Sequence, residues 1–194
     1  AMEVARVLEE SIHGKASGID TAAVAANGAI GYSMEKGVTE KLGVSRDFSF
    51  ILIDTGERRS TRTQIEEVSV HRNREPELFR ALAKEAAVQV EALVEGMSQG
   101  SRSRAFEAIA SLGELLGALG LESSESRALR ESMASRGLAL KVTGAGGGGF
   151  LLGLAADDEK HRELLAAPEL AGRVLEFSVP AYIGLDDRQV GGLG

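Results

Sequence analysis

The sequence predicts an α+β fold, in which strands near both ends of the chain flank a central block of helices. Residues 61–136 are rich in Ala, Leu, Glu and Arg with helical spacing of the apolar side chains, which favours helices. Short apolar runs on either side of this block are typical of strands. These strands are expected at residues 29–32, 48–53, 138–142, 150–154 and 174–179.

The helices are delimited by residues that disfavour helical backbone. Breaks near Pro76, around 98–101 and around 120–124 divide the central block into four helices, and another short helix is expected at 158–165. Near the start of the chain, Asp20 before an Ala-rich run indicates an N-capped helical turn.

The chain opens directly in a helical pattern that runs from Ala1 to about Ser11. Either Met2 is the true start after one extra residue, or upstream sequence has been removed or is encoded on another chain.

The composition excludes several classes of function. The length of 194 residues suits one domain. The chain has 22 basic and 29 acidic residues, and the resulting net charge of −7 does not favour binding to nucleic acid or to an anionic membrane. The absence of cysteine excludes disulfides, thiolate catalysis and cysteine zinc sites. No apolar run approaches the roughly 20 residues of a membrane span, and no signal peptide is evident. We therefore expect a cytoplasmic protein that acts on a small metabolite.

A glycine-rich segment stands between two of the expected strands. Residues 144–149 contain five glycines in six positions, and the apolar flanks differ from those of a flexible linker. Glycine allows positive φ, so successive N–H groups can converge on a phosphate or a substrate oxygen. A tight turn between strands is an equally good explanation of the glycines alone, and Thr143 is either a hydroxyl donor or the last strand residue. The segment matches neither a Walker A motif nor a dinucleotide fingerprint.

A second polar segment, residues 11–20, lies between the first two expected helices. Asp20 is a candidate acceptor for the proton of a substrate hydroxyl, although the N-cap role is the simpler reading of this segment alone. His13 and Lys15 are by themselves more often solvated loop residues than ligands. Glu9 could bind a hard cation through oxygen, or it could be a surface residue.

Read together, the two segments resemble motifs of a known family. Residues 13–20, His-Gly-Lys-Ala-Ser-Gly-Ile-Asp, resemble the H-G-x-P-S-G-x-D segment of mevalonate kinases. Residues 141–149 resemble the K-L-T-G-A-G-G-G-G segment of the same enzymes. The resemblance covers essentially the whole chain and implies the C-terminal part of a GHMP kinase fold, an antiparallel sheet with a block of helices. It implies a remnant of the N-terminal-domain interface with the catalytic loop at 1–60 and the C-terminal domain at 61–194.

The resemblance also implies roles for individual residues. Asp20 would be the catalytic carboxylate, and Glu9 would bind Mg²⁺. Arg59 and Thr61, in a stretch similar to the P-R-N-T-R of the family, would contact the substrate, although both could be ordinary helix-entry residues. The further implied residues are His13, Lys15 and Ser17 for substrate and Thr143, Gly144, Ala145, Gly146, Gly147 and Gly148 for the loop that shapes the active centre.

Three departures from the family pattern are visible. Ala16 replaces the usual proline, and Phe150 stands where a small residue or cysteine is common. The phosphate loop of the family, P-x-x-x-G-L-G-S-S-A, and its N-terminal lysine and substrate histidine are not found in the sequence. We therefore expect an N-terminal GHMP half on another chain, or one that has been removed, and weak binding of ATP by this chain alone.

The function implied by the resemblance is ATP-dependent phosphorylation of a small-molecule alcohol, with ATP and Mg²⁺ as cofactors. The expected acceptor is mevalonate, which would become 5-phosphomevalonate in the mevalonate pathway of isoprenoid biosynthesis. Phosphomevalonate, galactose or another sugar are alternative acceptors. A different alternative is a non-catalytic binding or assembly module. Apolar surface where the missing half would dock predicts association with a partner or with a second copy.

Overall fold

A computed structural model describes residues 18–26, 28–33, 35–57, 61–144 and 146–182. Contacts divide the described chain into two compact units. The smaller unit contains the described residues up to 47 together with 179–182, and the larger contains those of 48–178. The first predicted helix, which runs to about Ser11, lies outside the described residues.

The smaller unit combines one short helix with a two-stranded sheet. Helix α2 (Ile19–Ala26) precedes strands β1 (Ile30–Ser33) and β2 (Gly37–Lys41), which pair in antiparallel fashion with an irregularity between Gly31 and Tyr32. An isolated bridge joins Val44 to Tyr182 and ties the chain after β2 to the far end of the described sequence.

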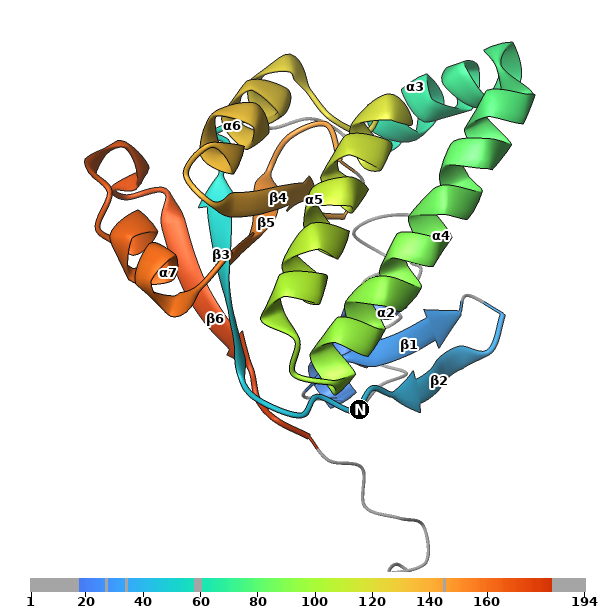
Figure 1. Cartoon of the computed structure of the whole chain (residues 1–194). Coiled ribbons are helices and arrows are strands. Elements are labelled where there is room, and N and C mark those ends of the chain that lie inside the picture. Colours follow the sequence, from blue (N-terminus) through green and yellow to red (C-terminus); the bar gives the residue numbers. More distant parts are fainter. Residues whose placement is uncertain (1–17, 27, 34, 58–60, 145, 183–194) are drawn as a thin grey trace, which may run out of the picture. The chain divides into compact units, whose positions relative to one another are not determined.

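The larger unit is built on a four-stranded sheet in the order β4-β5-β3-β6 (Figure 1). Its strands are β3 (Phe48–Asp54), β4 (Leu138–Val142), β5 (Phe150–Ala155) and β6 (Val174–Val179). Strand β5 pairs antiparallel with both β4 and β3. Helices follow the first and third of these strands, which is the connectivity of a split βαβ arrangement and confirms the α+β prediction.

The helices of the larger unit begin and end close to the predicted breaks. They are α3 (Thr61–Arg74), α4 (Pro76–Ser98), α5 (Arg102–Ala118), α6 (Ser124–Ala134) and α7 (Asp158–Leu165). Pro76 occupies the first turn of α4, where its missing N–H costs nothing. The side chains of Ser101, Ser123 and Asp157 cap α5, α6 and α7 by accepting backbone N–H bonds, which explains why those helices start where they do.

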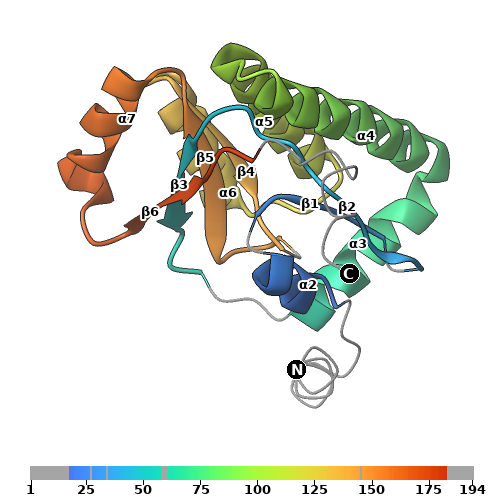
Figure 2. The same cartoon turned by 90° about the horizontal axis from the view of Figure 1, so that it is seen from below.

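The main core lies against one face of the large sheet. Its fully buried members include Ile51 and Ile53 of β3 and Leu138 and Leu140 of β4, which pack with residues of α6, α7 and the 3₁₀ turn Pro168–Leu170. Figures 1 and 2 show α7 next to the β3–β6 end of the sheet and the α4–α5 pair next to its β4 end. Leu116 of α5 packs against the same core. The loop between β4 and β5 extends from one end of these two strands.

Helix α5 also lies close against strand β4. A Cβ built on Gly113 of α5 would come within 2.1 Å of the Leu140 carbonyl oxygen, so only glycine allows this approach. The Thr143 N–H donates to the Phe150 carbonyl, and the alternation of an antiparallel ladder then directs the Leu140 carbonyl away from β5. The helix thus covers the outer edge of β4.

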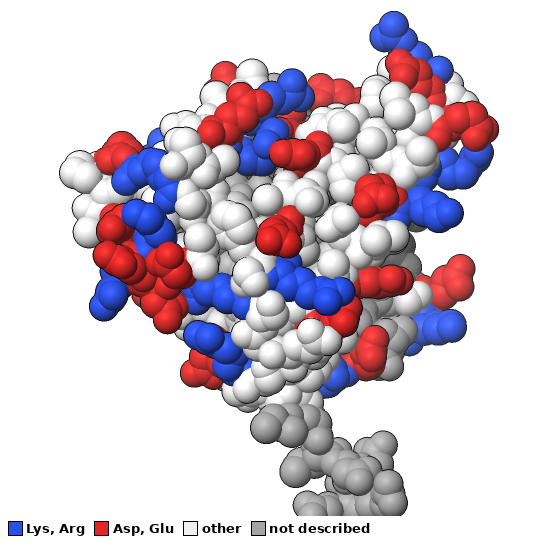
Figure 3. All heavy atoms as spheres, in the orientation of Figure 1, with Lys and Arg blue, Asp and Glu red and all other residues white. Residues whose placement is uncertain are grey.

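The surface seen in Figure 3 carries Lys and Arg interspersed with Asp and Glu. Among the described helices, none combines the length and apolarity that a membrane crossing requires. Strand β2 and the turn Pro168–Leu170 were not predicted from the sequence.

Candidate active site

The glycine-rich loop is a compact turn that joins β4 to β5. At its base, the N–H and the hydroxyl of Thr143 both donate to the Phe150 carbonyl oxygen, at 3.2 and 2.7 Å. The described loop glycines have positive φ, from 58° at Gly144 to 134° at Gly148. A run of such residues is strained for any L-amino acid, so the sequence must supply glycine to form this turn.

Two other segments of the chain hold the loop. The Gly147 N–H donates to the Leu121 carbonyl oxygen at 2.8 Å, and the Gly149 N–H donates to the Glu57 carbonyl oxygen at 3.1 Å. The Gly149 carbonyl in turn accepts from the N–H and the hydroxyl of Thr55, both at 2.9 Å. The loop is therefore a fixed element of the larger unit, braced by the segment after β3 and by the α5–α6 connection.

Two N–H groups of the loop are left available to a ligand. Those of Gly144 and Gly148 have no acceptor in the described chain, whereas the Gly146 N–H closes a turn on the Thr143 carbonyl at 3.2 Å. A Cβ on Gly148 would lie 2.9 Å from the Cβ of Glu57, so a side chain is excluded there. Unpaired N–H groups on a preformed glycine turn are suited to bind an anion such as a phosphate oxygen.

Lys141 is the last cation of β4 before this loop. Its Nζ donates to the Val142 carbonyl oxygen at 3.2 Å, and no carboxylate pairs with it in the described chain. Burial lowers the pKa of Lys141 below its ordinary value of 10.5, because desolvation penalises the charged ammonium. The folded chain therefore carries a destabilising charge at this position at neutral pH.

Replacing Lys141 with methionine is expected to raise Tm at pH 7 by about 2 °C, because a similar volume remains without the charge. The unfolded chain binds the Lys141 proton more tightly than the folded chain does. The free energy of unfolding of the wild type should therefore rise relative to that of the variant as the pH rises through the lowered pKa towards 10.5. Differential scanning calorimetry between pH 7 and pH 10 measures this difference. In the control, Lys160→Met, no gain is expected, because a hydrogen bond to Glu163 raises the pKa of Lys160. Equal effects of the two changes would contradict the assignment.

Some of the other predicted site residues lie within the ranges that the structure describes, and others lie outside them. Asp20 is the second residue of α2, which begins at Ile19. The predicted role of Asp20 as the N-cap is therefore wrong, because an N-cap at Asp20 requires a helix that begins at Thr21, two residues later. Thr61 is the first residue of α3, as the helix-entry alternative predicted. Glu9, His13, Lys15, Ser17, Arg59 and Ala145 lie outside the described residues.

The roles implied by the family resemblance require Asp20 and the glycine loop to line the same cleft. This stays a prediction, because the two belong to different compact units. The Mg²⁺ site predicted at Glu9 also stays a prediction. Within the described ranges, no group of three or more His, Asp or Glu side chains could hold a metal ion.

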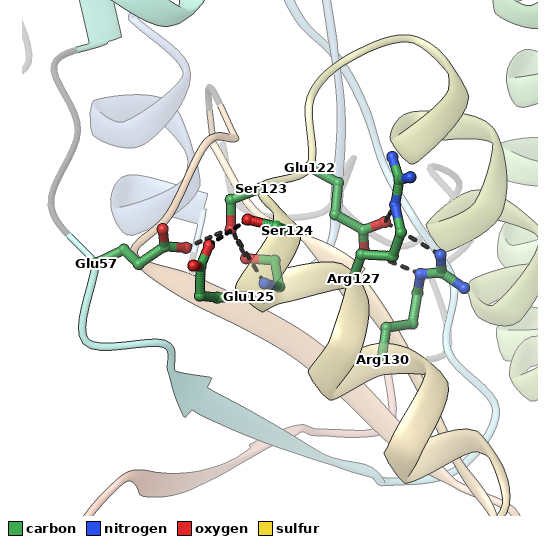
Figure 4. Close-up of polar contacts among 8 residues, drawn as sticks. Glu57, Glu122, Ser123, Ser124, Glu125, Arg127 and Arg130 are labelled. Carbon is green, nitrogen blue, oxygen red and sulfur yellow. Dashed lines mark hydrogen bonds and ion pairs between the residues drawn. The ribbon is translucent and has the colours of Figure 1, made fainter.

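Three residues that support the loop were not predicted. Glu57 and Leu121 offer the carbonyl groups that receive the loop N–H bonds, and the Ser123 hydroxyl donates to the Glu57 carboxylate (Figure 4). Backbone carbonyls leave no signature in a sequence. The one usable signal was Ser123, a residue type that commonly caps a helix, within the predicted break at 120–124.

Comparison with known proteins gives a consistent result. Residues 90–171 match the family model described as GHMP kinases C terminal. A curated mevalonate kinase of Archaeoglobus fulgidus is 30% identical over 174 residues, which cover 90% of this chain and 58% of that protein. The chain thus spans little more than half the length of that relative.

Solved structures show the same fold. The L. major mevalonate kinase in complex with R-mevalonate aligns with a TM-score of 0.79 at 21% identity, over 91% of this chain and 56% of that one. The Streptococcus pneumoniae phosphomevalonate kinase in complex with phosphomevalonate and AMPPNP aligns with a TM-score of 0.61 at 20% identity, over 78% of this chain and 51% of that one.

Proposed function

Since the chain carries the C-terminal domain of the GHMP kinases, we propose that it takes part in ATP-dependent phosphorylation of a small-molecule alcohol, with mevalonate as the acceptor. The observation that carries the proposal is the braced glycine turn, whose Gly144 and Gly148 N–H groups are unpaired in the described chain. The similarity to a curated mevalonate kinase, which extends over 90% of this chain, favours mevalonate over other acceptors.

In this reaction the chain would act mainly by positioning groups and by stabilising charge. Asp20 would accept or orient the proton of the 5-hydroxyl as the oxygen attacks the γ-phosphorus, giving 5-phosphomevalonate and ADP. The glycine turn would lie beside the phosphates. Mg²⁺, with Glu9 as the proposed ligand, would neutralise phosphate charge when bound.

The proposal includes a second component. Because the chain spans 58% of its curated relative, we propose that a further GHMP part with the phosphate loop completes the site. The described loop has only a few free N–H donors, so the chain alone should hold ATP weakly. Association with that part is expected to bury some of the large apolar side chains that are exposed in the described chain.

The test has a binding arm and an activity arm. Isothermal titration calorimetry of ATP and Mg²⁺ into this chain should show no binding in the micromolar range. Coexpression with a GHMP kinase part that carries the phosphate loop should then yield ATP-dependent product, detected by ³¹P NMR. Mevalonate, phosphomevalonate and galactose are offered in parallel, so a preference for either of the latter two would revise the acceptor. Micromolar binding by the chain alone, or a folded complex that phosphorylates none of the three, would contradict the proposal.

A further inference from the structure

The connection between α5 and α6 contacts the glycine loop at Leu121 and is bonded to two other segments through neighbouring residues. We call residues 120–123 the brace. The Gly120 carbonyl accepts from Gln64 Nε2 at 2.8 Å, the Leu121 carbonyl accepts from the Gly147 N–H at 2.8 Å, and the Ser123 hydroxyl donates to Glu57. The brace is therefore held by α3 and by the segment after β3 while it bonds the loop.

Glu122, the remaining brace residue, has a buried charge. Its side chain is only 1% exposed, and its two carboxylate oxygens accept from Nε and Nη2 of Arg130 at 2.9 and 3.1 Å (Figure 4). Arg127 adds a more distant ion pair, with Nε 3.6 Å from the carboxylate. A bidentate ion pair of this kind fixes the relative orientation of the two side chains as well as their distance. Loss of either side chain leaves the charge of the other buried and unpaired.

The pair adjoins the part of the brace that contacts the loop. Glu122 directly follows Leu121, so the Leu121 carbonyl belongs to the peptide that leads into Glu122. This carbonyl fits the loop closely, because a Cβ built on Gly146 would lie 2.2 Å from its oxygen. The start of α6 does not itself need Glu122, since the Ser123 hydroxyl already accepts the Ser126 N–H at 3.1 Å.

We infer that the Glu122–Arg130 pair is a positioning device for the glycine loop: it fixes the Leu121 carbonyl so that the loop keeps its unpaired N–H groups directed at a phosphate-bearing ligand. The inference on the ligand rests on the proposed function, whereas the inference on the loop does not. Small displacements of positioning groups reduce phosphoryl transfer strongly, so both residues should influence the reaction without touching the reacting atoms.

Amide hydrogen exchange of the chain, measured by NMR, tests the positioning directly. In Glu122→Gln, which keeps the shape and removes the charge, exchange at the Gly147 N–H should become about tenfold faster, and that at Gly149 should rise less. Exchange at Leu151 and Leu152 in β5 reports on the sheet and should stay within about twofold of wild type. The control is Asp158→Asn, the same carboxylate-to-amide change in the ion pair with Arg102, and it should leave Gly147 unaffected.

A second variant keeps the test decisive if Glu122→Gln fails to fold. Arg130→Lys retains the positive charge but loses the two-pronged bond, so it should give a smaller acceleration at Gly147. If exchange at Gly147 in the folded variants matches wild type, or rises only as much as that of the β5 amides, the pair has no positioning role.

Activity then separates the two proposals. In the completed enzyme, both variants should raise the KM for ATP at least tenfold with little change in the KM for the alcohol. An unchanged KM for ATP would overturn the inference on the ligand. If the completed enzyme has no kinase activity, the proposed function fails, while the exchange result still decides whether the pair positions the loop.

Discussion

Replacing Asp20 with asparagine is expected to lower kcat about a thousandfold in the completed enzyme. The amide keeps the size of the carboxylate but neither accepts the proton of the acceptor hydroxyl nor carries negative charge. Loss of a positioned general base typically costs between a hundredfold and ten thousandfold. Steady-state assays of ADP release with saturating mevalonate measure the loss, and circular dichroism shows whether the fold persists.

The control for Asp20→Asn is Glu40→Gln, which makes the same chemical change at an exposed residue of β2 in the same unit. Its turnover should stay within about twofold of wild type. Near-normal turnover by the Asp20 variant would remove that residue from the chemistry. A loss of activity accompanied by loss of helical signal would instead assign it a structural role.

Replacing Gly146 with alanine should have the largest effect of any single change in the loop. Gly146 has φ of 78°, and its Cβ would lie 2.2 Å from the Leu121 carbonyl oxygen, which is backbone and cannot rotate away. The left-handed conformation costs about 1–2 kcal/mol, and relief of the contact requires the loop to separate from the brace. We expect Tm to fall by about 8 °C and kcat/KM to fall at least tenfold.

Gly144→Ala is the matched control for Gly146→Ala. Gly144 also has positive φ, 58°, but no atom lies within 4 Å of its built Cβ. Only the conformational cost remains, so Tm should fall by about 3 °C. If the two alanine variants lose the same stability in thermal unfolding, contact with Leu121 is not what requires glycine at position 146.

The helices were predictable because local sequence determines them. Helix-forming residues fill 61–136, and the predicted breaks coincide with Pro76 and with the capping residues Ser101 and Ser123, so the structure confirms four helices there. Strand β2 was missed because its sequence, Gly-Val-Thr-Glu-Lys, contains a single apolar side chain, Val38, which is 44% exposed. Its pairing with β1 is what makes it a strand.

The glycine loop was predictable as a special turn, but its partners were not. Leu121 and Glu57 lie far from Gly147 and Gly149 in the sequence, and the bonds that join Leu121 to Gly147 and Glu57 to Gly149 use backbone carbonyls, which every residue has. Glu122 looked like any acidic residue between two helices, because its burial and its pair with Arg130 depend on tertiary packing. A resemblance to a family could supply Asp20 as a candidate, whereas spacing alone favoured a capping role that the start of α2 does not support.

The approach of α5 to β4 at Gly113 has a consequence for the behaviour of the chain in concentrated solution. The outer carbonyl of Leu140 is the kind of group through which a foreign strand extends a sheet and begins aggregation. With the helix backbone lying against it, an incoming strand would have to displace α5 before it could bond there. A glycine in the middle of a helix, unfavourable by propensity, thus protects the molecule against intermolecular strand addition along this side.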